Sequence, residues 1–117
     1  MNREEVVEAI EKEFKIAAGA RNAGNDGKVR VCARRAAGKA IGYWLTAHPE
    51  KRWGADVMNH LRNAQLDASI PPPVQEAAQR LTTRITEQFR SPFSTDPMAD
   101  SRVIINYFLG DDAGWNQ

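Results

Sequence analysis

The sequence predicts an all-α protein: a single domain built as an up-and-down bundle of four main helices plus a C-terminal fifth helix. Alanine is abundant, apolar residues recur every three to four positions, and no run alternates apolar with polar residues for long enough to form a strand. A chain of 117 residues is long enough for one compact domain. We expect the bundle to span residues 1–110 and a C-terminal tail to span residues 111–117.

The first helix is expected from about Asn2 to Ala20. Val6, Ile10 and Phe14 recur at four-residue spacing and form an apolar stripe that can face a neighbouring helix. Asn2 is a residue type that caps helix N-termini well, because its side chain can accept a hydrogen bond from a backbone amide of the first turn.

The second helix is expected to begin at Asn25 or Asp26. It should end before His48, because the residue preceding Pro49 is pushed out of the helical region. Alanines, glycines and basic residues are spread around its circumference, so few directions are left for plain solvent. We therefore expect this helix to be central, with long basic side chains that reach past its neighbours.

Three further helices are expected at Ala55–Ala68, from Pro72 or Pro73 to about Arg90, and from Asp96-Pro97 to about Leu109. Their expected buried residues are Val57 or Met58, Leu61 and Leu66 in the third helix, Val74, Ala77 or Ala78, Leu81, Ile85 and Phe89 in the fourth, and Val103, Ile104, Tyr107 and Phe108 in the fifth.

The net charge of +1 conceals an uneven distribution of charge along the chain. Residues 1–20 carry a charge of −2, whereas residues 21–53 carry +6. Charge segregated in this way can create a local positive field even in a nearly neutral protein. Two interpretations are open: the acidic first helix neutralises the basic second helix when they pack, or the basic edge faces a ligand.

Cysteine usage and the N-terminal sequence favour a cytoplasmic protein. The single Cys32 cannot form an internal disulfide. The N-terminus is acidic, unlike a signal peptide, and no stretch approaches the ~18 consecutive apolar residues of a membrane span. Nearby arginines could make the Cys32 thiolate reactive, but a cysteine in an alanine-rich helix is more simply a small buried apolar group.

The two histidines are the first candidates for chemistry. His60 lies four residues after Asp56, on one face of a helix, with Asp67 two turns further on. This spacing is compatible with a metal site or with a general base oriented by a carboxylate. The simpler interpretation is an exposed ion pair between His60 and Asp56, because no second histidine or cysteine completes a ligand set. We predict no metal and no cofactor, and His48 is interpreted as a turn residue.

Gly38 and Gly42 form a GxxxG spacing in the second helix. Each glycine costs up to about 1 kcal/mol relative to alanine inside a helix, so a packing benefit is expected in return. The neighbouring helix can belong to the same chain or to a second copy of it, and we favour the same chain.

The remaining signal is a set of basic residues with aromatic residues close by in sequence. Bases bind phosphates and aromatic rings stack on nucleobases, so this set can form a surface for a nucleic acid or a nucleotide. The alternative is a solvated charge face that only assists helix pairing, with Trp44 in the core. The predicted binding residues are Arg21, Lys28, Arg35, Lys39, Lys51 and Arg52, and the neighbouring aromatics are Tyr43, Trp44 and Trp53.

Three segments carry a resemblance to a known family: the alanine-rich ARRAAGKAIGYWL, the short DVMNHLR, and the longer VQEAAQRLTTRITEQF, which precedes a proline-containing turn. With these segments the chain resembles the HEPN (higher eukaryotes and prokaryotes nucleotide-binding) helical domain family over roughly Val6 to Leu109. The resemblance implies an up-and-down helical bundle, frequent homodimerisation, and association with nucleotides or RNA.

Many members of that family are RNA-cleaving toxins that use an arginine and a histidine with four to six residues between them. This chain departs from the pattern, so the resemblance assigns no catalytic residue. The positions where the arginine would stand are Trp53, Gly54 and Ala55 before His60, and Ile41, Gly42 and Tyr43 before His48.

Three functional hypotheses follow. The leading one is a noncatalytic HEPN-like binding module whose basic central helix contacts a nucleotide, a nucleic acid or an acidic protein partner, alone or as a homodimer. The second is a structural or dimerisation protein in which the second helix is the packing seam. The third is an enzyme with an unrecognised site around Asp56, His60 and Cys32.

Overall fold

The computed structural model describes residues 2–83 and 96–110. The predicted C-terminal tail, residues 111–117, and the predicted core residues Ile85 and Phe89 lie outside these ranges. The described residues confirm the all-α prediction. They form five helices, α1 (Arg3–Asn22), α2 (Asp26–Thr46), α3 (Val57–Leu66), α4 (Pro72–Thr82) and α5 (Pro97–Leu109).

Local capping contacts fix where the helices begin. The Asn2 side chain accepts a hydrogen bond from the Glu5 amide at 2.8 Å, and the Glu5 carboxylate accepts one from the Asn2 amide at 3.2 Å. This reciprocal pair satisfies two amides that the helix itself leaves without partners. Asn25 caps α2, and Asp96 caps α5 with Pro97 as its first residue. These starting points agree with the sequence predictions.

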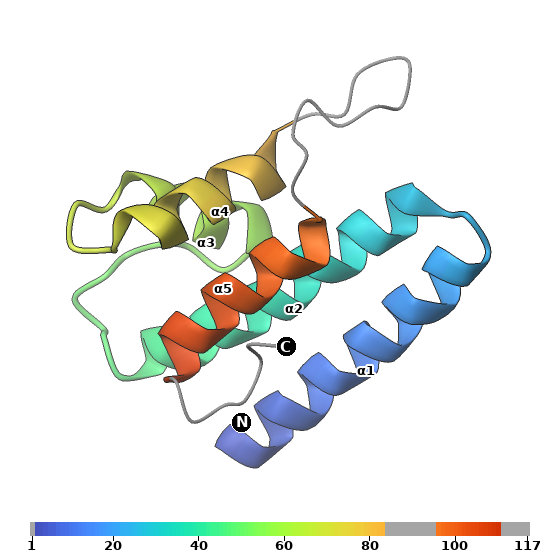
Figure 1. Ribbon diagram of the computed structural model, residues 1–117. Coiled ribbons are helices and arrows are strands. Elements are labelled where there is room, and N and C mark those ends of the chain that lie inside the picture. The colour runs from blue at the N-terminus through green and yellow to red at the C-terminus, as the bar shows by residue number, and fades with distance from the viewer. Residues whose placement is uncertain (1, 84–95, 111–117) are drawn as a thin grey trace.

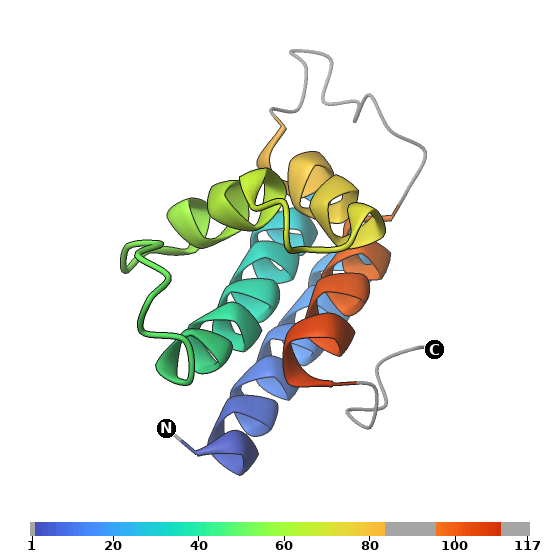
Figure 2. The same ribbon diagram turned by 90° about the vertical axis from the view of Figure 1, so that its left-hand side faces the viewer.

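Helix α2 lies at the centre of the bundle, in contact with each of the other four helices. Figure 1 shows α1 along one side of α2, α5 in front of it, and the α3–α4 hairpin on the side away from α1. The view in Figure 2 shows the same α2 between α3 and α5, with α1 behind it. The predicted central position of the second helix is therefore confirmed.

Helix α5 runs parallel to α2. Near its start, the Ser101 hydroxyl donates a hydrogen bond to the Ala33 carbonyl at 2.8 Å. Near its end, the Phe108 ring meets the Trp44 ring edge-on, with 5.0 Å between centroids. One contact joins the N-terminal halves of the two helices and the other joins their C-terminal ends. Helices α2 and α5 therefore run in the same direction (Figure 1).

The glycines of α2 face α3 of the same chain. A Cβ built on Gly38 would lie 2.6 Å from Val57 Cγ2, far closer than normal contact, whereas one on Gly42 would lie 3.8 Å from His60 Cε1. Only glycine at position 38 lets the two helices approach this closely. The favoured interpretation of the GxxxG spacing, an intramolecular partner, is confirmed for these two glycines.

Helix α4 is shorter than the sequence predicts. It was expected to continue to about Arg90, but it ends at Thr82, and Thr83 has extended backbone angles. The Thr83 hydroxyl donates to the Gln79 carbonyl at 2.8 Å, a local bond that competes with the helical pattern. Of the predicted continuation, residues 84–90 lie outside the described ranges.

Two arginines of α2 bind the C-terminal end of α4. Arg30 donates hydrogen bonds to the carbonyls of Arg80 and Thr83, the latter at 2.7 Å, and Arg34 donates to the Leu81 carbonyl at 2.6 Å. The last carbonyls of a helix have no partners within it and carry the negative end of its dipole, so guanidinium groups suit them well. Burial lowers the pKa of both arginines from their ordinary value.

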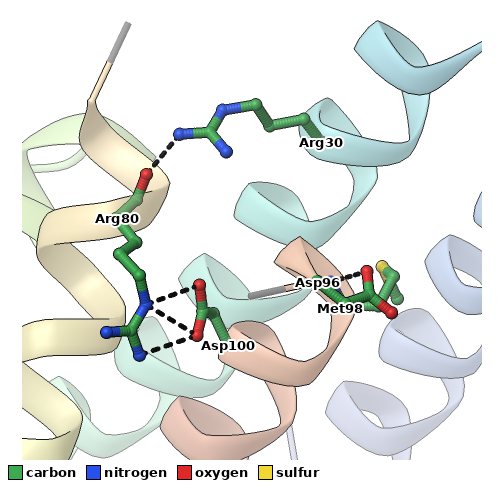
Figure 3. Close-up of polar contacts among 5 residues, drawn as sticks. All are labelled: Arg30, Arg80, Asp96, Met98 and Asp100. Carbon is green, nitrogen blue, oxygen red and sulfur yellow. Dashed lines mark hydrogen bonds and ion pairs between the residues drawn. The ribbon is translucent and has the colours of Figure 1, made fainter. Parts of the chain in front are cut away.

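Figure 3 shows that this contact continues into α5. The side chain of Arg80 forms a fork-like ion pair with Asp100, whose carboxylate oxygens lie 2.9–3.1 Å from the guanidinium nitrogens. The Asp100 residue is only 2% exposed. One chain of polar contacts therefore links α2, α4 and α5, and neither Arg30 nor Arg34 is a surface cation.

Three burial predictions were wrong. Leu66, expected in the core, is 76% exposed, because it lies five residues after the buried Leu61 and therefore points nearly half a turn away from it. Val103 and Tyr107, four residues apart, share the outer face of α5 and are exposed, whereas Ile104 and Phe108 are buried as predicted. Trp53, whose burial the sequence did not predict, lies in the connection before α3 and is buried.

We predict opposite effects for alanine at the two glycines of α2. Gly42→Ala should raise the free energy of unfolding by up to about 1 kcal/mol, because alanine is the better helix former and the added methyl has room. Gly38→Ala should lower it, because overpacking against the stiff Val57 typically costs about 1–3 kcal/mol. Urea unfolding of both variants measures the difference.

The control for this pair is the double variant Gly38→Ala with Val57→Ala, which removes the contacts at 2.6 and 3.1 Å and leaves Val57 Cβ at 3.2 Å. Its deficit relative to Val57→Ala alone should be smaller than the deficit of Gly38→Ala relative to wild type. Equal stabilisation by Gly38→Ala and Gly42→Ala would contradict the close approach of α2 and α3.

Candidate functional site

One side of α2 carries three cations in a row, which we call the basic strip: Lys28, Arg35 and Lys39. Lys28 and Arg35 are exposed and Lys39 is partly exposed. Eleven helical steps separate Lys28 from Lys39, which is roughly 16 Å along the helix. On one flank Cys32 faces α1, and on the other Gly38 faces α3. Their spacings of seven and four residues place the three cations on one face of the helix.

The cations of the basic strip are not paired with acids. In residues 2–83 and 96–110, neither Lys28, Arg35 nor Lys39 forms a salt bridge within 4.0 Å of a carboxylate. An exposed cation without an ion pair keeps its full field toward solvent. The strip differs in this respect from Arg21, Arg30, Arg34 and Lys51, which bind carboxylates or backbone carbonyls of the same chain.

One carboxylate of α1 lies beside the strip. Burial raises the pKa of the Cys32 thiol, and the Glu13 carboxylate raises it further by its charge and a hydrogen bond, whereas Arg35 and Lys28 act in the opposite direction. The net rise keeps the thiol protonated, as expected of a small buried group rather than of a reactive thiolate. Glu13 thus lies beside Cys32, on the flank of α2 that faces α1.

The other predicted binding residues do not join the basic strip. Arg21 and Lys51 belong to segments at opposite ends of α2 (Figure 1), and each is ion-paired. Arg21 holds Asp96, with a shortest N–O distance of 2.6 Å, and Lys51 holds Asp67 at 2.7 Å. Arg52 is exposed in the α2–α3 connection. The six predicted residues therefore form a strip of three, with Arg21, Lys51 and Arg52 in other segments.

The aromatic residues near the basic set are engaged in packing. Trp53 is buried, and its ring lies 5.3 Å from that of Trp44. The His48 ring stacks on Trp44 at 3.9 Å between centroids, and His48 Nδ1 lies 2.9 Å from the Trp44 carbonyl oxygen. His48 is thus a turn residue, as interpreted from the sequence. Because these contacts occupy Trp44 and Trp53, the basic strip gains no stacking platform from them.

A cleft lies between α1 and α5, apart from the basic strip. This α1–α5 cleft has a volume of about 180 Å³. The Arg102 guanidinium carbon lies 5.4 Å from the centroid of the Phe14 ring, in a cation–π contact across the cleft. The cleft is lined by Phe14, Ala17, Ala18, Arg21 and Asn22 of α1 and by Met98 and Arg102 of α5.

The carboxylate of Asp96 is held at the edge of this cleft. Arg21 donates to both of its oxygens, at 3.1 and 2.6 Å, and the Met98 amide donates to Oδ1 at 3.0 Å (Figure 3 shows the Met98 contact). Burial raises the pKa of Asp96, but the hydrogen bonds from Arg21 and Met98 and the charges of Arg21 and Arg102 outweigh it and lower the pKa overall. This end of the bundle binds an oxyanion of its own chain.

His60 is not the exposed partner of Asp56 that the sequence suggested. It is buried, and its Nε2 lies 3.0 Å from the Gly54 carbonyl oxygen, whereas Asp56 caps α3 and accepts from the Asn59 amide at 2.8 Å. The reason is that α3 begins at Val57, so Asp56 serves as N-cap and not as part of a helical face. In the described parts of the chain, no three His, Cys, Asp or Glu side chains gather into a possible metal site.

Sequence reasoning missed Arg102 and Phe14 as cleft residues and Arg30 and Arg34 as α4 caps. The signal for Arg102 was weak, because it depends on how α5 is placed against α1. For Arg30 and Arg34 a local signal existed: arginines four residues apart in a central helix must either reach solvent or find acceptors in a neighbouring helix.

Comparison with protein-family models, with curated proteins and with solved structures gives no match for this chain. Among the helices that the structure describes, none is both long enough and apolar enough to cross a membrane.

We predict that the Lys51–Asp67 pair contributes stability that acid removes. The hydrogen bond from Lys51, followed by those from Ser69, lowers the pKa of Asp67 from 3.8 to about 2. A carboxyl with a depressed folded-state pKa stabilises above its unfolded pKa and loses that contribution as pH falls through the folded value. The difference in unfolding free energy between wild type and Asp67→Asn should therefore be largest at about pH 5 and shrink toward about pH 2.

Lys51→Met is the matched variant for this prediction. Like Asp67→Asn, it should lose most of the pH dependence that the pair gives to the unfolding free energy. The double variant should be little less stable than either single variant. A stability difference that stays constant from about pH 5 to about pH 2 would show that Asp67 is not stabilised as its charged form.

Proposed function

We propose that this protein is a noncatalytic, HEPN-like binding module that contacts an extended polyanion, single-stranded RNA in the first instance, through the basic strip of α2. The observation that carries the proposal is the basic strip itself. Its three cations follow one side of the central helix and form no ion pair with the residues that the structure describes, whereas Arg21 and Lys51 are paired with carboxylates.

The length of the strip favours a strand over a compact ligand. Cations spread over roughly 16 Å of helix can contact successive phosphates of a chain. Because Trp44 and Trp53 are engaged in packing, the strip offers cations for phosphates but no tryptophan for stacking, and binding with little sequence preference follows. An acidic protein segment is the competing ligand, because it presents the same charge.

The HEPN-like part of the proposal rests on the three segments that resemble the family and on the order of five helices with a long alanine-rich α2 in the centre. The absence of the family's arginine–histidine spacing from the sequence makes the proposed role noncatalytic. The single, unpaired Cys32 supports a reducing, cytoplasmic location for the proposed module.

The test is fluorescence anisotropy of a labelled single-stranded RNA at several salt concentrations. Three phosphate contacts on a single strand predict a slope of about −2 for log K against log salt. A variant with Lys28→Gln, Arg35→Gln and Lys39→Gln should bind more weakly, with a slope near zero, and should keep its helical circular dichroism. Gel analysis of the RNA after the titration checks for cleavage, which the proposal predicts to be absent.

The matched control changes three other exposed cations to glutamine. It lowers the net charge equally but should leave the salt slope of the wild type intact. An equal loss of binding in both triple variants would show that RNA is attracted by the overall charge and not bound at the basic strip. The absence of binding at low salt would refute the RNA proposal, and shortened RNA would favour the enzyme hypothesis. The control residues are Lys12, Lys15 and Arg62.

A further inference from the structure

We propose that the α1–α5 cleft binds the phosphate group of a small organic ligand, with Arg21 and Arg102 as its cationic contacts. The two arginines come from different helices and line the same cleft, and Asn22 adds a side-chain amide at its edge. Guanidinium groups are well suited to phosphate because they present several donors in a fixed plane. This inference uses different residues from the basic strip and does not rest on the proposed function.

The contacts of Asp96 show that this end of the bundle already binds an oxyanion. Its carboxylate receives two hydrogen bonds from Arg21 and one from the Met98 amide at the N-terminal end of α5. The field of Arg102 also reaches it. A phosphate oxygen would use the same donors, so Asp96 acts as an internal competitor that the ligand must displace from Arg21 or accommodate beside it.

The cation of the cleft that is best placed for a further anion is Arg102. Asp96 is ion-paired with Arg21, and the charge of Asp26 also reaches Arg21. The Arg102 guanidinium lies over one face of the Phe14 ring, which holds the charge in place. Within residues 2–83 and 96–110, Arg102 forms no ion pair with a carboxylate.

The size and walls of the cleft define the ligand class. Its volume of about 180 Å³ is smaller than the roughly 300 Å³ at which pockets for drug-sized molecules begin. The walls between the arginines are apolar, formed by Phe14, Ala17 and Met98. The ligand that fits is a phosphomonoester with a small apolar or aromatic body, and phenyl phosphate is a suitable probe.

The experiment is an NMR titration of the full chain with phenyl phosphate, and separately with inorganic phosphate, followed through backbone amide shifts. Phenyl phosphate should give saturable shifts at the cleft amides and bind more tightly than inorganic phosphate, because its ring contacts the apolar wall. Asp96→Asn is the decisive variant, because asparagine caps a helix about as well as aspartate but carries no charge.

Removing this competitor should tighten phenyl phosphate binding by up to about fivefold, the value of one exposed ion pair. Arg102→Gln should weaken it by a similar factor, whereas Arg102→Lys should retain much of it. Lys28→Gln, a charge-matched change outside the cleft, should leave it unchanged. Thermal unfolding of each variant confirms that the fold is intact.

Weaker or unchanged binding in Asp96→Asn, or equal effects of Arg102→Gln and Lys28→Gln, would overturn the proposal. So would shifts that are spread evenly over the surface. If an arginine variant fails to fold, Asp96→Asn alone still decides the outcome. Failure here leaves RNA binding by the basic strip intact, and loss of RNA binding leaves the cleft intact, so the two proposals fail separately.

Discussion

The contact on which the rest of the structure depends is the one between Arg30 and Arg34 of α2 and the C-terminal end of α4. Burying a guanidinium is unfavourable unless acceptors replace its water, and the terminal carbonyls of α4 supply them. This contact fixes the α3–α4 hairpin against α2. Once α3 is in place, it covers Gly38 and Gly42, while α1 covers the opposite flank. The basic strip is part of the surface of α2 that these helices leave uncovered.

The basic segment of the sequence thus separates into groups with different physical roles. Arg30 and Arg34 donate hydrogen bonds to backbone carbonyls of α4. Arg21 and Lys51 form ion pairs with carboxylates at the two ends of the bundle, and the basic strip faces solvent. The charge of +6 in residues 21–53 therefore overstates the field that a ligand meets. A local patch, not the total charge, decides where an anion can bind.

Much of the fold followed from local rules in the sequence, and the errors came from contacts between distant residues. Asn2, Asn25 and Asp96 cap their helices through side chains that act within the first turn, so sequence alone located them. By contrast, the burial of His60 and Trp53 depends on how the α2–α3 connection folds back on α2. The face shared by the strip cations was predictable from helical periodicity, whereas the α1–α5 cleft was not, because it joins residues about eighty positions apart.

The contacts of α5 also bear on the order in which the bundle assembles. Helices α1 and α2, like α3 and α4, are joined by short connections, so each pair can form with little loss of chain entropy. Helix α5 instead meets partners far away along the chain: Ser101 binds Ala33, and Arg3 donates to the Leu109 carbonyl at 2.6 Å. Such contacts close long loops, so we expect them to form late. The last helix is therefore expected to dock after the two hairpins have formed and to join them.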